Sequence, residues 1–305
     1  MTPGPSDDMD MDSLFELGNR YYDGDGVEID LQLALQYYRK AAELGHTIAM
    51  NDVGYMYKEG EGVEQSIDEA VKWYTMSADQ GYAVAEFNLG LCYLNGDGVK
   101  QDSKRALELM RSSAEKGYSY GQYGLGHLYE YGVELEESYD EAIRWYRLAA
   151  EQGVVDAQKR LGNLLDSDVF VEKDSEEAFK WYMMAAEQGD RDSQFSVAHM
   201  FSVGEGVEQS HSESFKWFER SAKNGSLSAT YRLACCYRDG LGVEQSHSRS
   251  FELFLDAGER GHNLAWKELA HMYAEGIGVK PDDKEAEKWG AKYREWKEYD
   301  ELYPF

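Results

Sequence analysis

The chain has little proline and little cysteine. Only four prolines occur among its 305 residues, and none lies between Pro5 and Pro281. Because proline interrupts helices, this gap favours helical structure throughout. The chain has three cysteines, Cys92, Cys235 and Cys236. A small and odd number of cysteines does not form a disulfide framework. Cysteine usage of this kind favours a reducing compartment.

Membrane-spanning and export signals are also lacking. No apolar stretch reaches the length of a membrane span. Residues 1–10 are acidic and contain neither the basic start nor the apolar core of a signal peptide. We therefore expect a cytoplasmic protein without membrane insertion, a flexible segment over residues 1–10, and a monomer as the default state.

Basic side chains are heavily outnumbered. The chain has 58 acidic and 31 basic side chains, which gives a net charge of −27. Residues 1–200 hold 39 acidic and 17 basic groups, whereas residues 201–250 hold six of each. A field of this sign repels nucleic acid and speeds encounter with a basic partner, although the same charge also suits a merely solvated surface.

The sequence does have one pattern of 36 residues, repeated eight times without insertion or deletion. A fixed period of this size is typical of a solenoid, in which each unit buries its apolar face on its neighbours. The pattern predicts an all-α solenoid of about eight helix pairs. Its most regular position is occupied by valine or leucine at Val27, Val63, Val99, Leu135, Val171, Val207, Val243 and Val279.

The second copy, residues 46–81, shows how one repeat works. Ala49, Val53 and Met56 fall at helical spacing and predict a first helix, which ends at Gly60. A second helix is expected to begin at Ser66. The equivalent position is a good N-cap in all eight copies: Asp30, Ser66, Asp102, Ser138, Asp174, Ser210, Ser246 and Asp282.

Two further columns of residues carry structural predictions. In five copies a glutamate follows the N-cap by three residues, which predicts capping boxes at Glu69, Glu141, Glu177, Glu213 and Glu285. The middle of the first helix holds only glycine or alanine, which predicts a close approach of the second helix. These positions are Gly18, Gly54, Gly90, Gly126, Gly162, Ala198, Ala234 and Ala270.

The repeat carries a family resemblance. The run Leu89-Gly90-x-x-Tyr93-x-x-Gly96-x-Gly98-Val99-x-x-Asp102, and the run Ala-x-x-Trp-Tyr-x-x-Ala-Ala-x-x-Gly from Ala142 to Gly153, resemble the Sel-one-like repeat (SLR) of the tetratricopeptide class. The resemblance implies a right-handed superhelix of antiparallel helix pairs, with first helices on the concave side. It covers residues 11–298 as a single solenoid domain of eight SLR units, followed by a capping helix and a tail at 299–305.

Copies four and five depart from the pattern in the loop between their helices. Glu134 replaces the second loop glycine of copy four, and Asp168 and Phe170 replace both glycines of copy five. Because phenylalanine tolerates a left-handed backbone poorly, the loop around Phe170 should take a different path. We expect Phe170 to fold back onto the core; the alternative is that it is displayed as an anchor.

The resemblance implies an adaptor or scaffold, and aromatic anchors in a concave groove are typical of recognition sites. We therefore predict a bacterial protein–protein interaction module that binds a basic protein or peptide. The alternative is an immunity or inhibitor protein that neutralises a toxin or enzyme. Some aromatic positions are equally suited to packing between repeats. The predicted partner-binding residues are Tyr55, Phe87, Leu91, Leu94, Tyr120, Tyr123, His127, Tyr131, Phe195, His199 and Tyr231.

Enzyme signatures are weak. His199, Cys235 and His271 share one repeat position, but neighbouring first helices lie roughly 10 Å apart, too far for three ligands to reach one zinc ion. Ser113-x-x-Lys116 matches a penicillin-binding signature by letter and lacks its partner motifs. We expect no catalytic, cofactor or metal site.

Overall fold

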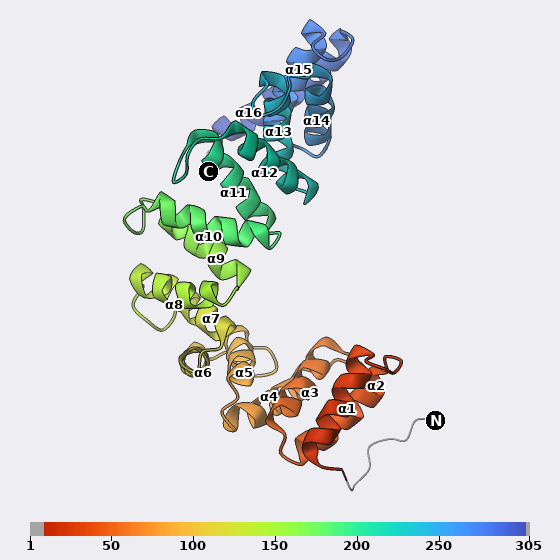
Figure 1. Cartoon of the computed structure of the whole chain (residues 1–305), viewed down its shortest axis with the longest axis vertical. Coiled ribbons are helices and arrows are strands. Elements are labelled where there is room, and N and C mark those ends of the chain that lie inside the picture. The colour runs from red at the N-terminus through yellow and green to blue at the C-terminus, as the bar shows by residue number, and fades with distance from the viewer. Residues whose placement is uncertain (1–8, 303–305) are drawn as a thin grey trace. The chain divides into compact units, whose positions relative to one another are not determined.

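The computed structural model describes residues 9–302, and these residues form sixteen α-helices and no strand (Figure 1). Odd-numbered helices are the first helices of the repeats and even-numbered helices are the second. No helix in the described part of the chain is both long and apolar enough to cross a membrane. The helices are α1 (Met11–Asp23), α2 (Leu31–Glu43), α3 (Thr47–Glu59), α4 (Ile67–Asp79), α5 (Ala83–Asn95), α6 (Ser103–Glu115), α7 (Ser119–Glu130), α8 (Tyr139–Glu151), α9 (Val155–Leu165), α10 (Ser175–Glu187), α11 (Arg191–Val203), α12 (His211–Lys223), α13 (Leu227–Asp239), α14 (His247–Glu259), α15 (Asn263–Glu275) and α16 (Asp283–Leu302).

The predicted N-caps of the second helices are confirmed. Each of the eight side chains accepts a hydrogen bond from a backbone N–H in the first turn, as Asp30 does from Leu33 at 2.9 Å. The N-cap's own N–H donates to a carbonyl near the end of the preceding first helix, as in Ser66 to Tyr57 at 2.9 Å. One polar residue thereby starts the second helix and fixes it to the first.

Only one of the two hydrogen bonds of each predicted capping box is present. The N-cap side chain accepts its bond, but the prediction that the glutamate completes the box is wrong. A capping box requires the glutamate to accept from the N-cap N–H, but that N–H already donates to the first helix, as Ser138 does to Tyr129. The glutamates bind other groups. Glu141 accepts from Arg144 at 3.2 Å, and Glu177 accepts from the indole of Trp181 at 3.1 Å.

The predicted close approach of paired helices is confirmed. A Cβ atom placed on Gly18 would lie 2.5 Å from the ring of Tyr38, and one on Gly54 would lie 2.8 Å from the ring of Tyr74. Contacts below 3.0 Å are too short for carbon atoms. The absent side chain therefore lets a large buried aromatic of the second helix lie flat against the first helix.

The second loop glycine also packs against the preceding repeat. A Cβ on Gly62 would lie 2.5 Å from the carbonyl oxygen of Leu31, and one on Gly206 would clash with that of Ser175. Glu134 takes this position in copy four and keeps the left-handed backbone, with φ of 56°. The loop of copy four therefore follows the common path at the cost of some backbone strain.

The loop of copy five takes a different path, as predicted. Helix α9 has 11 residues where most of the other helices have 13, and neither Asp168 nor Phe170 has a positive φ. The expectation that Phe170 folds back onto the core is wrong, because 48% of its side-chain surface is exposed. The loop lacks the two glycines that most other copies have at these positions, and the side chain at position 170 remains at the surface. Val169 beside it is 74% exposed.

The chain divides into two compact units. Unit 1 ends at Ala157 and unit 2 begins at Gln158, so the division falls within α9. Within unit 1, α2, α4 and α6 each pack on their own first helix and on the next one, and α8 packs on α7. In unit 2, consecutive helices from α10 to α16 pack in the same alternating way. The cores hold alanines and, in most pairs, large aromatic side chains such as Tyr74 and Phe254. The single domain over 11–298 stays a prediction.

The two ends of the chain bear on the other domain expectations. Asp10 caps α1, and residues 1–8 of the expected flexible segment lie outside the described residues. Helix α16 continues to Leu302, so it includes the first four residues of the expected tail. Residues 303–305 lie outside the described residues.

Candidate functional site: the outer side of the first helices

Unit 1 exposes aromatic rings on its first helices. Tyr55 of α3 is 41% exposed, and Tyr120 of α7 is 48% exposed. Tyr131, which caps the C-terminus of α7, is 54% exposed. These are the most exposed aromatic side chains among the described residues of unit 1. All three were predicted to bind a partner, and they offer large rings at little cost in side-chain entropy.

Other predicted residues of unit 1 are more deeply set. Phe87 and Tyr123 are half-buried, and the Tyr123 ring lies 5.6 Å from the buried ring of Tyr146. Leu91 and Leu94 are partly buried against the core formed by α6 and α7. These four residues hold the helices together and leave only part of their surface for a partner.

Exposed rings of this unit lie close to neighbouring aromatic rings. The Tyr120 ring lies 5.9 Å from that of Tyr118 and 6.4 Å from that of Phe87. The exposed His127 ring lies 4.4 Å from that of Tyr131. We call Tyr55, Phe87, Leu91, Leu94, Tyr120, Tyr123, His127 and Tyr131 together the first-helix face of unit 1.

Of the three predicted residues of unit 2, two are half-buried aromatic residues and one is an exposed histidine. Phe195 and Tyr231 are half-buried, and their rings lie 5.6 Å and 5.5 Å from the buried rings of Phe218 and Phe254. Tyr231 also stacks on His262 at 4.4 Å. His199 is exposed.

Two of the three predicted residues of unit 2 border a cavity of about 340 Å³. His199 and Tyr231 line it together with Cys235, Arg232 and Arg238. Arg238 is ion-paired to Asp239 at 2.8 Å and to Glu268 at 2.9 Å. Burial raises the pKa of the Cys235 thiol, so this group is not an activated nucleophile. Within residues 9–302, no three His, Cys, Asp or Glu side chains form a metal-binding group.

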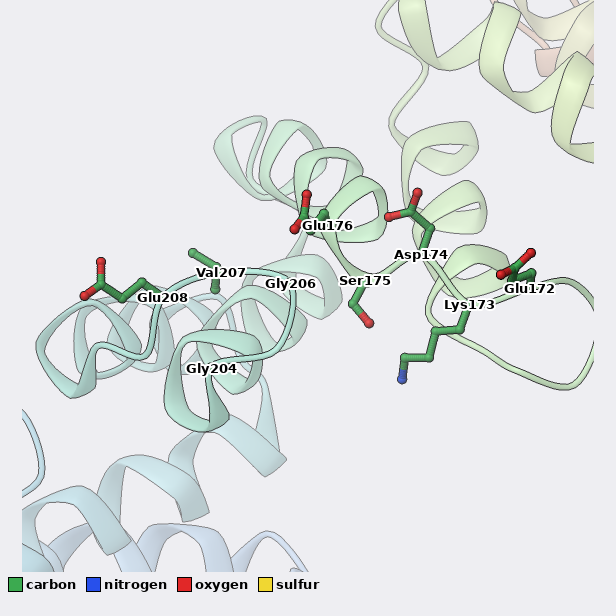
Figure 2. Close-up of a pocket in the computed structure, with 9 residues that line it drawn as sticks. All are labelled: Glu172, Lys173, Asp174, Ser175, Glu176, Gly204, Gly206, Val207 and Glu208. Atoms are coloured by element: carbon green, nitrogen blue, oxygen red, sulfur yellow. The ribbon is translucent and has the colours of Figure 1, made fainter.

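A second, larger cavity of about 720 Å³ lies between two loops of unit 2 (Figure 2). Its walls are the segments 172–176 and 204–208, which carry several carboxylates. Lys173 pairs with Glu205 at 2.7 Å and with Asp166 at 3.4 Å. Because its cation is neutralised and its walls offer few apolar groups, this crevice lacks the anchors of a recognition site.

The period, the helix pairs and the loop glycines are the features by which repeat families differ from one another. The Sel1 repeat pattern matches eight segments: residues 12–46, 47–82, 83–118, 119–154, 155–190, 191–226, 227–262 and 267–292. The chain belongs to the Sel1 repeat family. Sel1 repeat proteins are in general protein-interaction modules.

Two solved Sel1 repeat structures resemble this chain. One is a protective antigen with an SLR fold from uropathogenic Escherichia coli strains, which is 34% identical with a TM-score of 0.88. The match covers 94% of this chain and 62% of that one, so this chain spans less than two thirds of that protein. The other is a Sel1 repeat protein of Oxalobacter formigenes, 32% identical with a TM-score of 0.70, over 81% of this chain and 99% of that one.

More distant comparisons add nothing on function. An immunity protein of Pseudomonas aeruginosa matches at 21% identity and a TM-score of 0.47, over 72% of this chain and 84% of that one. A similarity this low carries no argument about activity. No curated protein matches this chain.

Sequence reasoning missed part of the surface of these Sel1 repeats. Asp52 lines a cavity in unit 1 beside Tyr55, yet it was not among the predicted residues. A signal was present, because the repeat position of Asp52 holds a charged residue in five of the eight copies: Glu16, Asp52, Arg160, Arg232 and Glu268. A charged column next to an apolar one marks a side of the helix that the core does not cover.

Proposed function

We propose that the first-helix face of unit 1 binds a basic segment of a partner protein, and that the chain acts as an adaptor or scaffold. The observation that supports the proposal most strongly is the placing of Tyr55, Tyr120 and Tyr131. In unit 1, exposed aromatic rings lie on first helices or their C-caps, whereas the second helices expose Met76 and Leu148.

The charge of the chain supports a basic partner. Acidic side chains exceed basic ones by 22 over residues 1–200. Such an excess raises the rate of encounter with a cationic segment, and the aromatic anchors then slow its release. Hot-spot residues of this kind contribute about 2 kcal/mol or more each to binding.

The test compares two double variants in capture from a native lysate. Tyr120→Ser/Tyr131→Ser removes two rings from the first-helix face. Met76→Ser/Leu148→Ser is the matched control, because it removes two comparably exposed apolar side chains from second helices of unit 1. We expect the first variant to lose at least tenfold in affinity for proteins that the wild type and the control both retain.

Both variants should keep the wild-type melting temperature, since neither changes a buried side chain. If the two variants lose the same proteins, or if neither loses any, the first-helix face is not the binding surface. Loss of binding by the control alone would move the surface to the second helices.

A further inference from the structure

A small cavity of about 260 Å³ lies between the first two first helices of unit 1. Helix α1 contributes Asn19, Tyr22 and Asp23, which share one face of the helix because they lie at positions i, i+3 and i+4. Helix α3 contributes Asp52 and Tyr55 in the same way. The cavity therefore opens between two neighbouring first helices of the same unit.

The aromatic walls of this cavity are held in place. The Tyr22 hydroxyl donates to Glu61 at 2.7 Å, and the Tyr38 hydroxyl donates to Asn19 at 2.8 Å. Tyr38 is buried and comes from α2. Rings held by hydrogen bonds lose little further entropy when a ligand binds, and the faces of aromatic rings attract organic cations.

The two carboxylates of the cavity have no counter-ion. Asp23 and Asp52 form no ion pair with any described residue. Asp52 is partly buried, and the hydrogen bond it accepts comes from the side chain of its neighbour Asn51 at 3.2 Å. A partly buried carboxylate without a counter-ion is unfavourable, and a cation in the cavity that both carboxylates line would remove that cost.

The same cavity recurs in unit 2 with other side chains. Every residue that lines the cavity of unit 1 has its counterpart 180 positions later, five repeats on, among the residues that line the 340 Å³ cavity of unit 2. Val203 stands in place of Asp23, and Arg232 stands in place of Asp52. The fold thus forms a pocket at this junction, and the side chains decide its charge.

We propose that the cavity of unit 1 binds the alkylammonium group of a lysine side chain, held between the rings of Tyr22 and Tyr55 and the carboxylates of Asp23 and Asp52. This inference deepens the proposed function, on which it rests, because it names one side chain of the basic partner. The cavity of unit 2, with Arg232 in it, repels the same group.

The test uses n-butylammonium, which is the lysine side chain from Cβ onwards, and n-butanol as its neutral counterpart. The reporter is the methyl resonance of Met56, which lines the cavity, in protein labelled at methionine methyl groups. Met200, which is buried beside His199 in unit 2, is the internal control. At pH 8 we expect n-butylammonium to shift the Met56 signal with saturation, and to leave Met200 unchanged.

Two variants locate the interaction. Asp52→Asn keeps the shape of the side chain and should weaken n-butylammonium binding by about tenfold, because a charged hydrogen-bond partner is lost. Asp79→Asn removes the same charge from an exposed site on α4 and should leave binding unchanged. No shift of Met56, an equal shift with n-butanol, or unchanged binding by Asp52→Asn would each overturn the proposal.

The outcome is independent of the capture experiment. If n-butylammonium fails to bind while Tyr120→Ser/Tyr131→Ser still loses its partner, the lysine pocket is wrong and the proposed function stands. If n-butylammonium binds and capture is unaffected, the pocket exists but the first-helix face is not the docking surface.

Discussion

At the scale of the residue, burial of the Asp52 carboxyl destabilises the folded state, and the same carboxyl is the group that we propose to bind a lysine. Burial raises the pKa of its carboxyl from 3.8 to about 6, and the hydrogen bond from Asn51 offsets only part of this rise. The titratable groups around it are Tyr22, Asp23, Tyr38, Tyr55, Tyr74 and Tyr82. Asp23 is the one carboxyl group in this set, and the other members are tyrosines.

The raised pKa of Asp52 predicts how the stability of the protein changes with pH. Between pH 4 and pH 6 the folded state holds a proton on Asp52 that the unfolded chain has lost, so stability falls as the pH rises through this window. We expect Asp52→Asn to be more stable than wild type by roughly 2 kcal/mol at pH 8, and the difference to vanish below pH 4.

Chemical denaturation at the two pH values measures the difference, with Asp79→Asn as the control for net charge. An advantage of the same size at both pH values would show that Asp52 is not strained by burial. A bound cation should reduce the cost, because it lowers the pKa of the carboxyl.

At the scale of the element, the caps of the second helices can be tested one by one. Ser138 accepts from the backbone N–H of Glu141, whereas the side chain of Glu141 binds Arg144 on the surface. We expect Ser138→Ala to lower the free energy of unfolding by about 1 kcal/mol. Glu141→Gln should change it by less than about 0.5 kcal/mol, since it breaks only an exposed ion pair.

Thermal or denaturant unfolding of the two variants distinguishes a single cap from a capping box. Equal losses in the two variants would mean that the glutamate does reach the N-cap in solution. That result would contradict the hydrogen bond from the Ser138 N–H to Tyr129 at 3.0 Å.

Most of the elements could be predicted because each depends on local chemistry. An N-cap, a helix-ending glycine and a small residue against an aromatic ring act within one repeat, and eight copies of the pattern reinforce one another. The capping boxes could not be predicted, since the N-cap N–H has a competing acceptor on another helix. The exposure of Phe170 could not be predicted, because its loop lacks the glycines that most other copies have at these positions.

At the scale of the whole molecule, the repeats share one arrangement of helices but differ in the side chains at their surface. The cavity between first helices was not predicted because three helices contribute to it, and only the 180-residue offset links its two forms. The first-helix face could be predicted in part. Its exposed tyrosines were identified, but the same pattern also selected Tyr123 and Phe195, which pack on buried rings.

The central claim is that a basic partner contacts the first-helix face of unit 1. Photo-crosslinking tests it most directly, with a benzoylphenylalanine in place of Tyr120 on α7 and, in a second protein, in place of the exposed Lys104 on α6. Our account expects position 120 to crosslink to a partner through a lysine-rich segment, and position 104 to give no such product. Crosslinks from position 104 alone, or from 120 to an acidic segment, would contradict it.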